Sequence, residues 1–207
     1  MTARWHGVVG LALVLLTALL GATVRSAPLS LDQSTFTAVN AANAGVLGAV
    51  FSLGNVLGSV AIWTLLVVGT CAVFWVLGHR RAALILVLAD LSAEAASFTL
   101  KALVDRARPT TGLVADIVAT ASFPSGHVVR ATAVLLVLLA IAGWRPASRA
   151  SAAVGIAAYL LILGAARVAS GEHWPSDVIG GYLLGAGWAA LVLTAAEAWG
   201  RVRARSG

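Results

Sequence analysis

Six long apolar runs constrain this chain more than any other feature of its sequence. A helix needs about 20 predominantly apolar residues to cross the hydrocarbon core of a bilayer. Runs close to that length lie at residues 7–24, 56–78, 82–104, 127–143, 152–168 and 176–199. The pattern predicts an all-α, polytopic membrane protein: one membrane-embedded domain over residues 1–207, with a bundle of six transmembrane helices.

Composition excludes the main alternatives. Hydrophobic residues make up 60% of the chain and charged residues 11%, whereas a soluble domain carries about 25% charged residues. Disorder is excluded too, since it needs low hydrophobicity and high charge. The net charge of +6 does not indicate nucleic-acid binding, because the basic residues form no stripe beside aromatic residues. The one cysteine, Cys71, can form neither an intramolecular disulfide nor a cysteine-based metal site.

The basic residues between the runs predict the orientation. They fall at alternate helix ends, at Arg4, Arg80, Arg81, Arg145, Arg149, Arg201, Arg203 and Arg205. Such residues mark the cytoplasmic side. Both termini are therefore expected on the cytoplasmic side of the cell (plasma) membrane. Segments 25–55, 105–126 and 169–175 are then extracytoplasmic, and 25–55 is expected to form one or two short interfacial helices. We interpret run 7–24 as a retained helix, since a signal peptide's apolar region usually has about 7–15 residues.

Charged and histidine side chains on the predicted outer side form three patches. Ionisable residues of membrane segments are functional candidates. In the first patch, Lys101 and Arg108 are seven residues apart, which places them on one helix stripe about 10 Å apart along the axis. Two cations so placed suit a multiply charged anion. The structural alternative is a snorkelling lysine and an arginine at a helix end.

The second and third patches add groups that can move protons and act as a nucleophile. Ser125 and Gly126 open the fourth run, where the N–H groups of a helix N-terminus favour an anion, and His127 follows on the first turn. In the third patch, His173 and Asp177 are four residues apart, so that a carboxylate can orient an imidazole nucleophile. Arg167 lies upstream and offers a bidentate fork for phosphate. Ordinary helix starts with interfacial histidines remain the alternative for both patches.

The three patches together resemble the three-part signature of the type-2 phosphatidic acid phosphatase superfamily. The order and spacing of the patches agree with that signature across residues 101–177. The matching residues are Lys101 with Arg108-Pro109, Pro124-Ser125-Gly126-His127, and Arg167 with His173 and Asp177. The chain departs from the pattern at Ala166, where the family usually has a serine that supports the site, and this puts the rate in question more than the activity.

The resemblance implies an integral membrane lipid phosphatase that needs neither metal nor cofactor. It implies that His173 attacks phosphorus and becomes a phosphohistidine, that Asp177 orients its imidazole, and that His127 protonates the leaving oxygen. The phosphate-binding residues implied by the resemblance are Lys101, Arg108, Ser125, Gly126 and Arg167. An undecaprenyl-type diphosphate is the favoured substrate, with phosphatidic acid and phosphatidylglycerophosphate as alternatives. The expected partners are the lipid substrate and membrane lipids, with no protein or nucleic acid among them.

Other polar residues leave alternatives open. Asp90 and Glu94 are expected to orient Lys101 or to pair with Arg130, or else to face a wet crevice. Arg106 and Glu172 are expected beside the site, where they could tune the choice of headgroup, and residues 110–122 could form a lid. A lipid-phosphate transporter and an inactive lipid-phosphate-binding protein remain the rival functions.

Overall fold

The computed structural model describes residues 3–109 and 121–206, and the chain forms only α-helices within these two ranges. The predicted all-α class is confirmed. The helices are α1 (Ala3–Val24), α2 (Ser30–Ala41), α3 (Gly45–Gly58), α4 (Val60–Val76), α5 (Arg80–Val104), α6 (Gly126–Ile141), α7 (Pro146–Ala169) and α8 (Pro175–Ser206).

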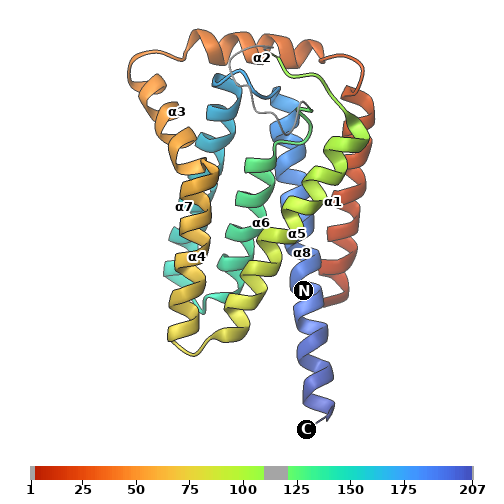
Figure 1. Ribbon diagram of the computed structural model, residues 1–207, viewed down its shortest axis with the longest axis vertical. Helices are drawn as coiled ribbons and strands as arrows, with labels where there is room; N and C mark the ends of the chain where they lie inside the picture. The colour runs from red at the N-terminus through yellow and green to blue at the C-terminus, as the bar shows by residue number, and fades with distance from the viewer. Residues whose placement is uncertain (1–2, 110–120, 207) are drawn as a thin grey trace.

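Most of the helices run alongside one another, while α2 lies across one end of the bundle (Figure 1). Four of them, α1, α5, α7 and α8, are long and apolar enough to cross a membrane on their own, and α4 and α6 are shorter apolar helices. The chain is therefore a multi-pass membrane protein. The number of spans, six, stays a prediction.

The segment predicted to be interfacial, residues 25–55, divides into two parts. Helix α2 crosses the bundle end, but α3 bends away from it by 111° and descends toward α4 (Figure 1). Two glycines on α3 allow its close packing against α7, because an added side chain would crowd the α7 side chains there. A Cβ atom at Gly58 would lie 2.3 Å from Leu163 Cδ1, and one at Gly54 would lie 3.1 Å from the Cβ of Ala166. The second predicted span thus merges with the end of α3.

The bundle places apolar side chains both inside and outside. Leu163 of α7 and Leu86 of α5 are fully buried, whereas Leu65 of α4 and Leu161 of α7 are 72% and 67% exposed. An apolar outer wall suits lipid rather than water. Helices α1 and α8 pack side by side.

Four chain segments meet beneath α2 at one end of the bundle (Figure 1). They are the end of α5, the start of α6, the end of α7 and the start of α8. These helix ends carry all three sequence patches. The fold therefore brings together residues that are more than 70 positions apart in the sequence.

Candidate active site

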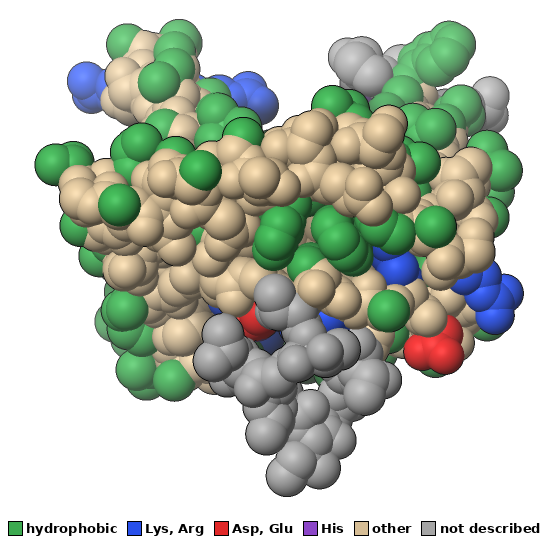
Figure 2. Space-filling view, turned by 90° about the horizontal axis from the view of Figure 1, so that it is seen from above, with side chains coloured by type: hydrophobic (Ala, Val, Ile, Leu, Met, Phe, Trp, Pro, Cys, Tyr) green, Lys and Arg blue, Asp and Glu red, His purple; other side chains and the backbone are tan. Residues whose placement is uncertain are grey.

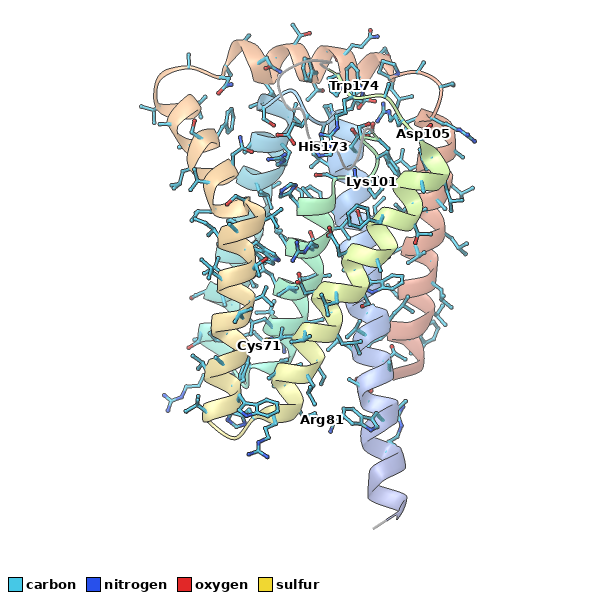
Figure 3. All side chains as sticks on the ribbon, viewed as in Figure 1. Cys71, Arg81, Lys101, Asp105, His173 and Trp174 are labelled. Atoms are coloured by element: carbon cyan, nitrogen blue, oxygen red, sulfur yellow. The ribbon has the colours of Figure 1, made fainter. Side chains whose placement is uncertain are left out.

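The first patch is held by a turn at the end of α5. Asp105 follows the helix with φ 48°, in the left-handed region that aspartate enters more readily than most residues. The side chain of Lys101 is buried, and its Nζ donates to the carbonyl oxygens of Ala121 at 2.8 Å and Ser122 at 3.4 Å. These bonds tie the lysine to the chain that leads into the second patch. Figure 3 shows Lys101 near His173, at the end of the bundle that α2 crosses.

The second patch begins α6 without a side-chain cap. Ser125 is the N-cap residue, yet its hydroxyl makes no capping bond, and its buried Oγ has no hydrogen-bond partner among the described residues. The backbone N–H of Ser125 donates instead to the carbonyl oxygen of Asp177 at 3.0 Å. This bond joins the second patch to the third. It leaves the serine hydroxyl and the first N–H groups of α6 available to an anion.

The third patch fixes one ring nitrogen of His173. Its Nδ1 lies 2.9 Å from the carbonyl oxygen of Ser122 and 3.7 Å from Asp177 Oδ2. A carbonyl oxygen only accepts, so Nδ1 carries the proton and Nε2 keeps a lone pair. Burial lowers the pKa of His173 to about 4. The ring is therefore neutral at pH 7, as a nucleophile must be.

Asp177 is tied to a buried arginine. Its Oδ1 accepts from Arg106 Nη1 at 2.5 Å, and its Oδ2 accepts from the Trp174 backbone N–H at 2.8 Å. Arg106 also pairs with Asp32 of α2 at 2.8 Å and is 2% exposed. Arg106 lies beside the site as expected, but its two Nη atoms are held by Asp177 and Asp32, so its role in headgroup choice stays a prediction.

Glu172 joins the two predicted phosphate-binding arginines. Its Oε2 lies 3.4 Å from Arg108 Nη1 and also pairs closely with Arg167 Nη2. Asn55 of α3 supports this arrangement, since its Oδ1 accepts from Arg167 Nη1 at 3.0 Å. The two cations are thus gathered around one carboxylate.

A cavity of about 240 Å³ connects the three patches. The predicted site residues that line it are Lys101, Arg108, Gly126, His127 and His173, with Glu172. Both histidines face one cavity, as a shared phosphorus atom requires. Ser125, Arg167 and Asp177 do not line it: Arg167 reaches its wall through Glu172, and Asp177 lies fully buried near His173. Viewed onto the α2 end, Figure 2 shows acidic and basic side chains close together in the hollow below α2.

Asp90 and Glu94 form a second charged group, deeper in the same bundle. Arg130 donates from Nε to Asp90 Oδ1 at 2.9 Å and from Nη2 to Asp90 Oδ2 at 2.8 Å, and its Nε lies 3.5 Å from Glu94 Oε2. The predicted pairing with Arg130 is confirmed. Glu94 and Arg130 also line the cavity. The ion pair with Arg130 and a position at a crevice, which the sequence offered as alternatives, therefore occur together.

Sequence reasoning missed two supporting residues. Asp32 accepts from the Leu29 N–H at 3.2 Å, as a helix cap does, and it also binds Arg106 and Ser176. A charged residue in an apolar outer segment was the available signal. Asn55 gave no signal, because its role depends on the descent of α3. The predicted lid, residues 110–122, lies almost wholly outside the described residues.

Ala166, where the chain departs from the family pattern, packs against α3. Ala166 is fully buried, faces Gly54 of α3, and its carbonyl oxygen accepts from Asn55 Nδ2 at 3.2 Å. Asn55 thus binds both Ala166 and Arg167, and so supports the site at the position where the family usually has a serine.

The described residues were also compared with the arrangements that hold a metal ion. No three His, Cys, Asp or Glu side chains within residues 3–109 and 121–206 are arranged to hold a metal ion. Independence from metal and cofactor nevertheless stays a prediction.

Comparisons with known proteins agree with this geometry. Residues 82–201 match the PAP2 superfamily, and all three patches lie inside that range. The fold resembles a transmembrane PAP2-type phosphatidylglycerolphosphate phosphatase from Bacillus subtilis, with 24% identity, a TM-score of 0.74, and coverage of 91% of this chain and 96% of that one. It also resembles LpxE from Aquifex aeolicus, with 25% identity, a TM-score of 0.62, and coverage of 80% and 96%. A search of curated protein sequences finds no significant match. The match covers more than half of the chain, and the protein therefore belongs to the PAP2 superfamily of membrane phosphatases.

Proposed function

We propose that this protein hydrolyses the phosphate ester or anhydride of a membrane lipid through a phosphohistidine on His173. The observation that carries the proposal is the single cavity in which His173 and His127 meet Lys101 and Arg108. Phosphoryl transfer depends chiefly on positioning and on neutralising the charge of the phosphoryl oxygens. Cationic side chains supply that neutralisation here.

The first step forms a bond between His173 Nε2 and phosphorus and breaks the bond from phosphorus to the lipid oxygen. His127 gives its proton to that oxygen. The Ser122 carbonyl oxygen holds Nδ1–H, and the Asp177 carboxylate at 3.7 Å stabilises the positive charge that develops on the ring. In the second step His127 takes a proton from water, the water oxygen attacks phosphorus, and inorganic phosphate leaves with the neutral histidine restored.

The phosphate oxygens would contact Lys101, Arg108 and Arg167, together with the Ser125 hydroxyl and the Gly126 N–H. Phosphate must then replace the Glu172 carboxylate between the two arginines. Ser125 Oγ has no partner among the described residues and precedes Gly126 of the cavity wall, which supports this assignment, although Ser125 itself does not line the cavity. The basic residues of the sequence support an extracytoplasmic site in the cell membrane. A lipid substrate would enter sideways, between the start of α4 and the outer part of α5, both of which line the cavity.

Phosphate release from detergent-solubilised lipids in the presence of EDTA tests the proposal. The panel contains undecaprenyl diphosphate, phosphatidic acid and phosphatidylglycerophosphate. We expect release by the wild type and none by His173→Ala at unchanged thermal stability. Binding of these lipids without release would favour an inactive binding protein, and transport into vesicles without release would favour a transporter.

The covalent intermediate needs its own measurement. A substrate with a good leaving group, such as ³²P-labelled nitrophenyl phosphate, reduces the need for the acid in the first step. His127→Ala should then accumulate labelled protein that is stable in alkali and labile in acid. No label on His127→Ala under conditions where the wild type turns over would contradict the phosphohistidine.

A further inference from the structure

An apolar groove of about 510 Å³ lies between α5 and α8, outside the catalytic cavity. Leu84, Leu88 and Leu91 of α5 line one side, and Val192, Ala195 and Ala196 of α8 line the other. The groove and the catalytic cavity share no lining residue. It belongs to the first half of α5, whereas the predicted phosphate-binding Lys101 lies near the end of that helix. The groove is therefore a separate feature, nearer the opposite end of the bundle.

The two sides of the groove differ in the size of their side chains. Leu84, Leu88 and Leu91 follow one another at intervals of four and three residues, so they form one stripe about 10 Å long. All three are exposed. Across from them, Ala195 and Ala196 carry only methyl groups, which leaves the hollow. A narrow apolar hollow on the outer wall of a membrane protein suits a hydrocarbon chain of a lipid.

Arg81 lies at the end of this groove. It precedes Ile85, another lining residue, by four positions and so shares its face of α5. Its Nη2 donates to the carbonyl oxygen of Ala196 at 2.5 Å, and its Cζ lies 5.8 Å from the ring centroid of Trp199. Both of these α8 residues line the groove. The guanidinium thus crosses from α5 to α8, and Figure 3 shows Arg81 at the end of the bundle away from Lys101 and His173.

The charge of Arg81 is not balanced by a carboxylate among the described residues. Glu197 of α8 pairs instead with Arg201 at 3.7 Å. A guanidinium has five N–H donors, and the bond to Ala196 uses one of them. Arg81 therefore keeps donors for an anion at the end of an apolar groove. Basic pockets between transmembrane helices on the cytoplasmic side bind anionic lipid headgroups, and the basic residues of this chain predict that this end is cytoplasmic.

We propose that the groove and Arg81 together bind one phospholipid with a net negative headgroup. An acyl chain lies between α5 and α8, and the phosphate contacts the Arg81 guanidinium. The lipid comes from the leaflet opposite the catalytic cavity, so it is a bound structural lipid and not the substrate. This inference does not depend on the proposed function.

Native mass spectrometry of the full-length protein tests the site. The protein is released from detergent after incubation with equal amounts of phosphatidylglycerol and phosphatidylcholine that have identical acyl chains, and the bound lipids are counted. We expect the wild type to bind phosphatidylglycerol about fivefold more strongly, the effect of one basic residue at a membrane surface. Both probes are phosphodiesters and lack the terminal phosphate group that the proposed chemistry removes.

Substitutions of Arg81 test the headgroup contact. Arg81→Gln should lower phosphatidylglycerol binding to the level of phosphatidylcholine. Arg81→Lys keeps the charge and should retain most of the preference, which separates the loss of the cation from a failure to fold. Arg149→Gln removes one exposed positive charge near the start of α7, at the same end of the bundle. It is the matched control and should keep the wild-type preference.

A substitution in the hollow tests the acyl-chain contact. Ala195→Leu adds a branched side chain to the groove and should weaken the binding of both lipids. Ala158→Leu makes the same change at an exposed position of α7 that does not line the groove, so it should leave binding unchanged. Equal effects of the two leucine variants would contradict the assignment of the acyl chain to this groove.

Three further outcomes would overturn the site. The first is equal binding of the two lipids by the wild type, or an unchanged preference in Arg81→Gln. The second is a preference that Lys101→Met abolishes and Arg81→Gln does not, which would place the lipid in the catalytic cavity. The third is a lipid-free dimer that Ala195→Leu dissociates, which would assign the groove to a second copy of the chain.

Discussion

Two clusters in this bundle each combine one arginine with two carboxylates, but they differ in their access to the cavity. In the sealed cluster (Asp32, Arg106, Ser176 and Asp177), the three charged side chains are at most 3% exposed. In the open cluster (Asp90, Glu94 and Arg130), exposure rises from 7% for Asp90 to 32% for Glu94. An arginine paired with two carboxylates can therefore hold helices together where it is buried, or remain open to a ligand where it borders a cavity.

Hydrogen bonding separates the clusters further. Asp32 accepts from Arg106, from the Ser176 N–H and hydroxyl, and from the Leu29 N–H. Glu94 Oε2 accepts from no described residue. In the sealed cluster both carboxylates are held by several donors, and only Arg106 Nε lacks a partner among the described residues, so this buried cluster holds α2 and α8 together. A carboxylate with an open acceptor at a cavity wall can still bind a ligand. Stability measurements should thus respond most to the sealed cluster.

Arg106→Met should give the largest loss of stability. It leaves the carboxylates of Asp32 and Asp177 buried without their cation, which costs about 3–5 kcal/mol. Thermal unfolding in detergent should detect the loss. Arg201→Met, at a side chain that is 57% exposed, is the matched control and should change little. Equal unfolding temperatures for the two variants would contradict the structural role of the sealed cluster.

His173 lies beside the sealed cluster, and its protonation reports how dry that region is. Burial lowers its pKa to about 4, below the ordinary value of about 6.5. A lowered histidine pKa favours the neutral, nucleophilic form, so activity should persist as pH falls to about 5 and decline as it passes through about 4.

The pH profile of kcat/KM measures this decline of activity at low pH. The ionisation of the substrate phosphate, followed separately by ³¹P NMR, provides the correction. After that correction, an enzymatic limb near pH 6.5 would mean that His173 is hydrated as in water, and the comparison of the two clusters would lose its basis.

Asp90→Asn should have a smaller effect than Arg106→Met. The amide keeps the shape of Asp90 but loses the charge that holds Arg130. Because the open cluster borders a cavity, water can enter and limit the cost to about 1–3 kcal/mol. The same thermal measurement provides the test. A loss as large as that of Arg106→Met would show that the cavity offers no access to water.

The sequence predicted local features of this protein better than its long-range contacts. The ends of α1, α5 and α6 follow the apolar runs within a few residues, because the need for buried backbone hydrogen bonds is local. The meeting of His127 with His173 followed from the topology, since basic loops placed all three patches at one end of the bundle.

Contacts that depend on helix packing could not be predicted in that way. Arg106 binds Asp32 and Asp177 across 74 and 71 residues, and no periodicity relates such positions. The close packing of α3 involves Gly54 and Gly58, and the sequence does not show that these two glycines face α7. Asp90 and Glu94 were identifiable because a charge inside an apolar run stands out, and the short spacing to Lys101 limited where they could lie.

Glu172 forms a third arginine–carboxylate contact, and its exposure lies within the range of the open cluster. Its side chain is 19% exposed and pairs with Arg108 and Arg167, the cations assigned to phosphate. Glu172→Gln removes the competing charge, so inorganic phosphate should inhibit more strongly, by about two- to fivefold, because a partly exposed ion pair contributes roughly 0–1 kcal/mol. Glu197→Gln, at the other end of the bundle, is the control for the loss of a negative charge. An inhibition constant that stays the same or rises in Glu172→Gln would mean that the carboxylate helps to hold the arginines in place, as the carboxylates of the sealed cluster hold Arg106.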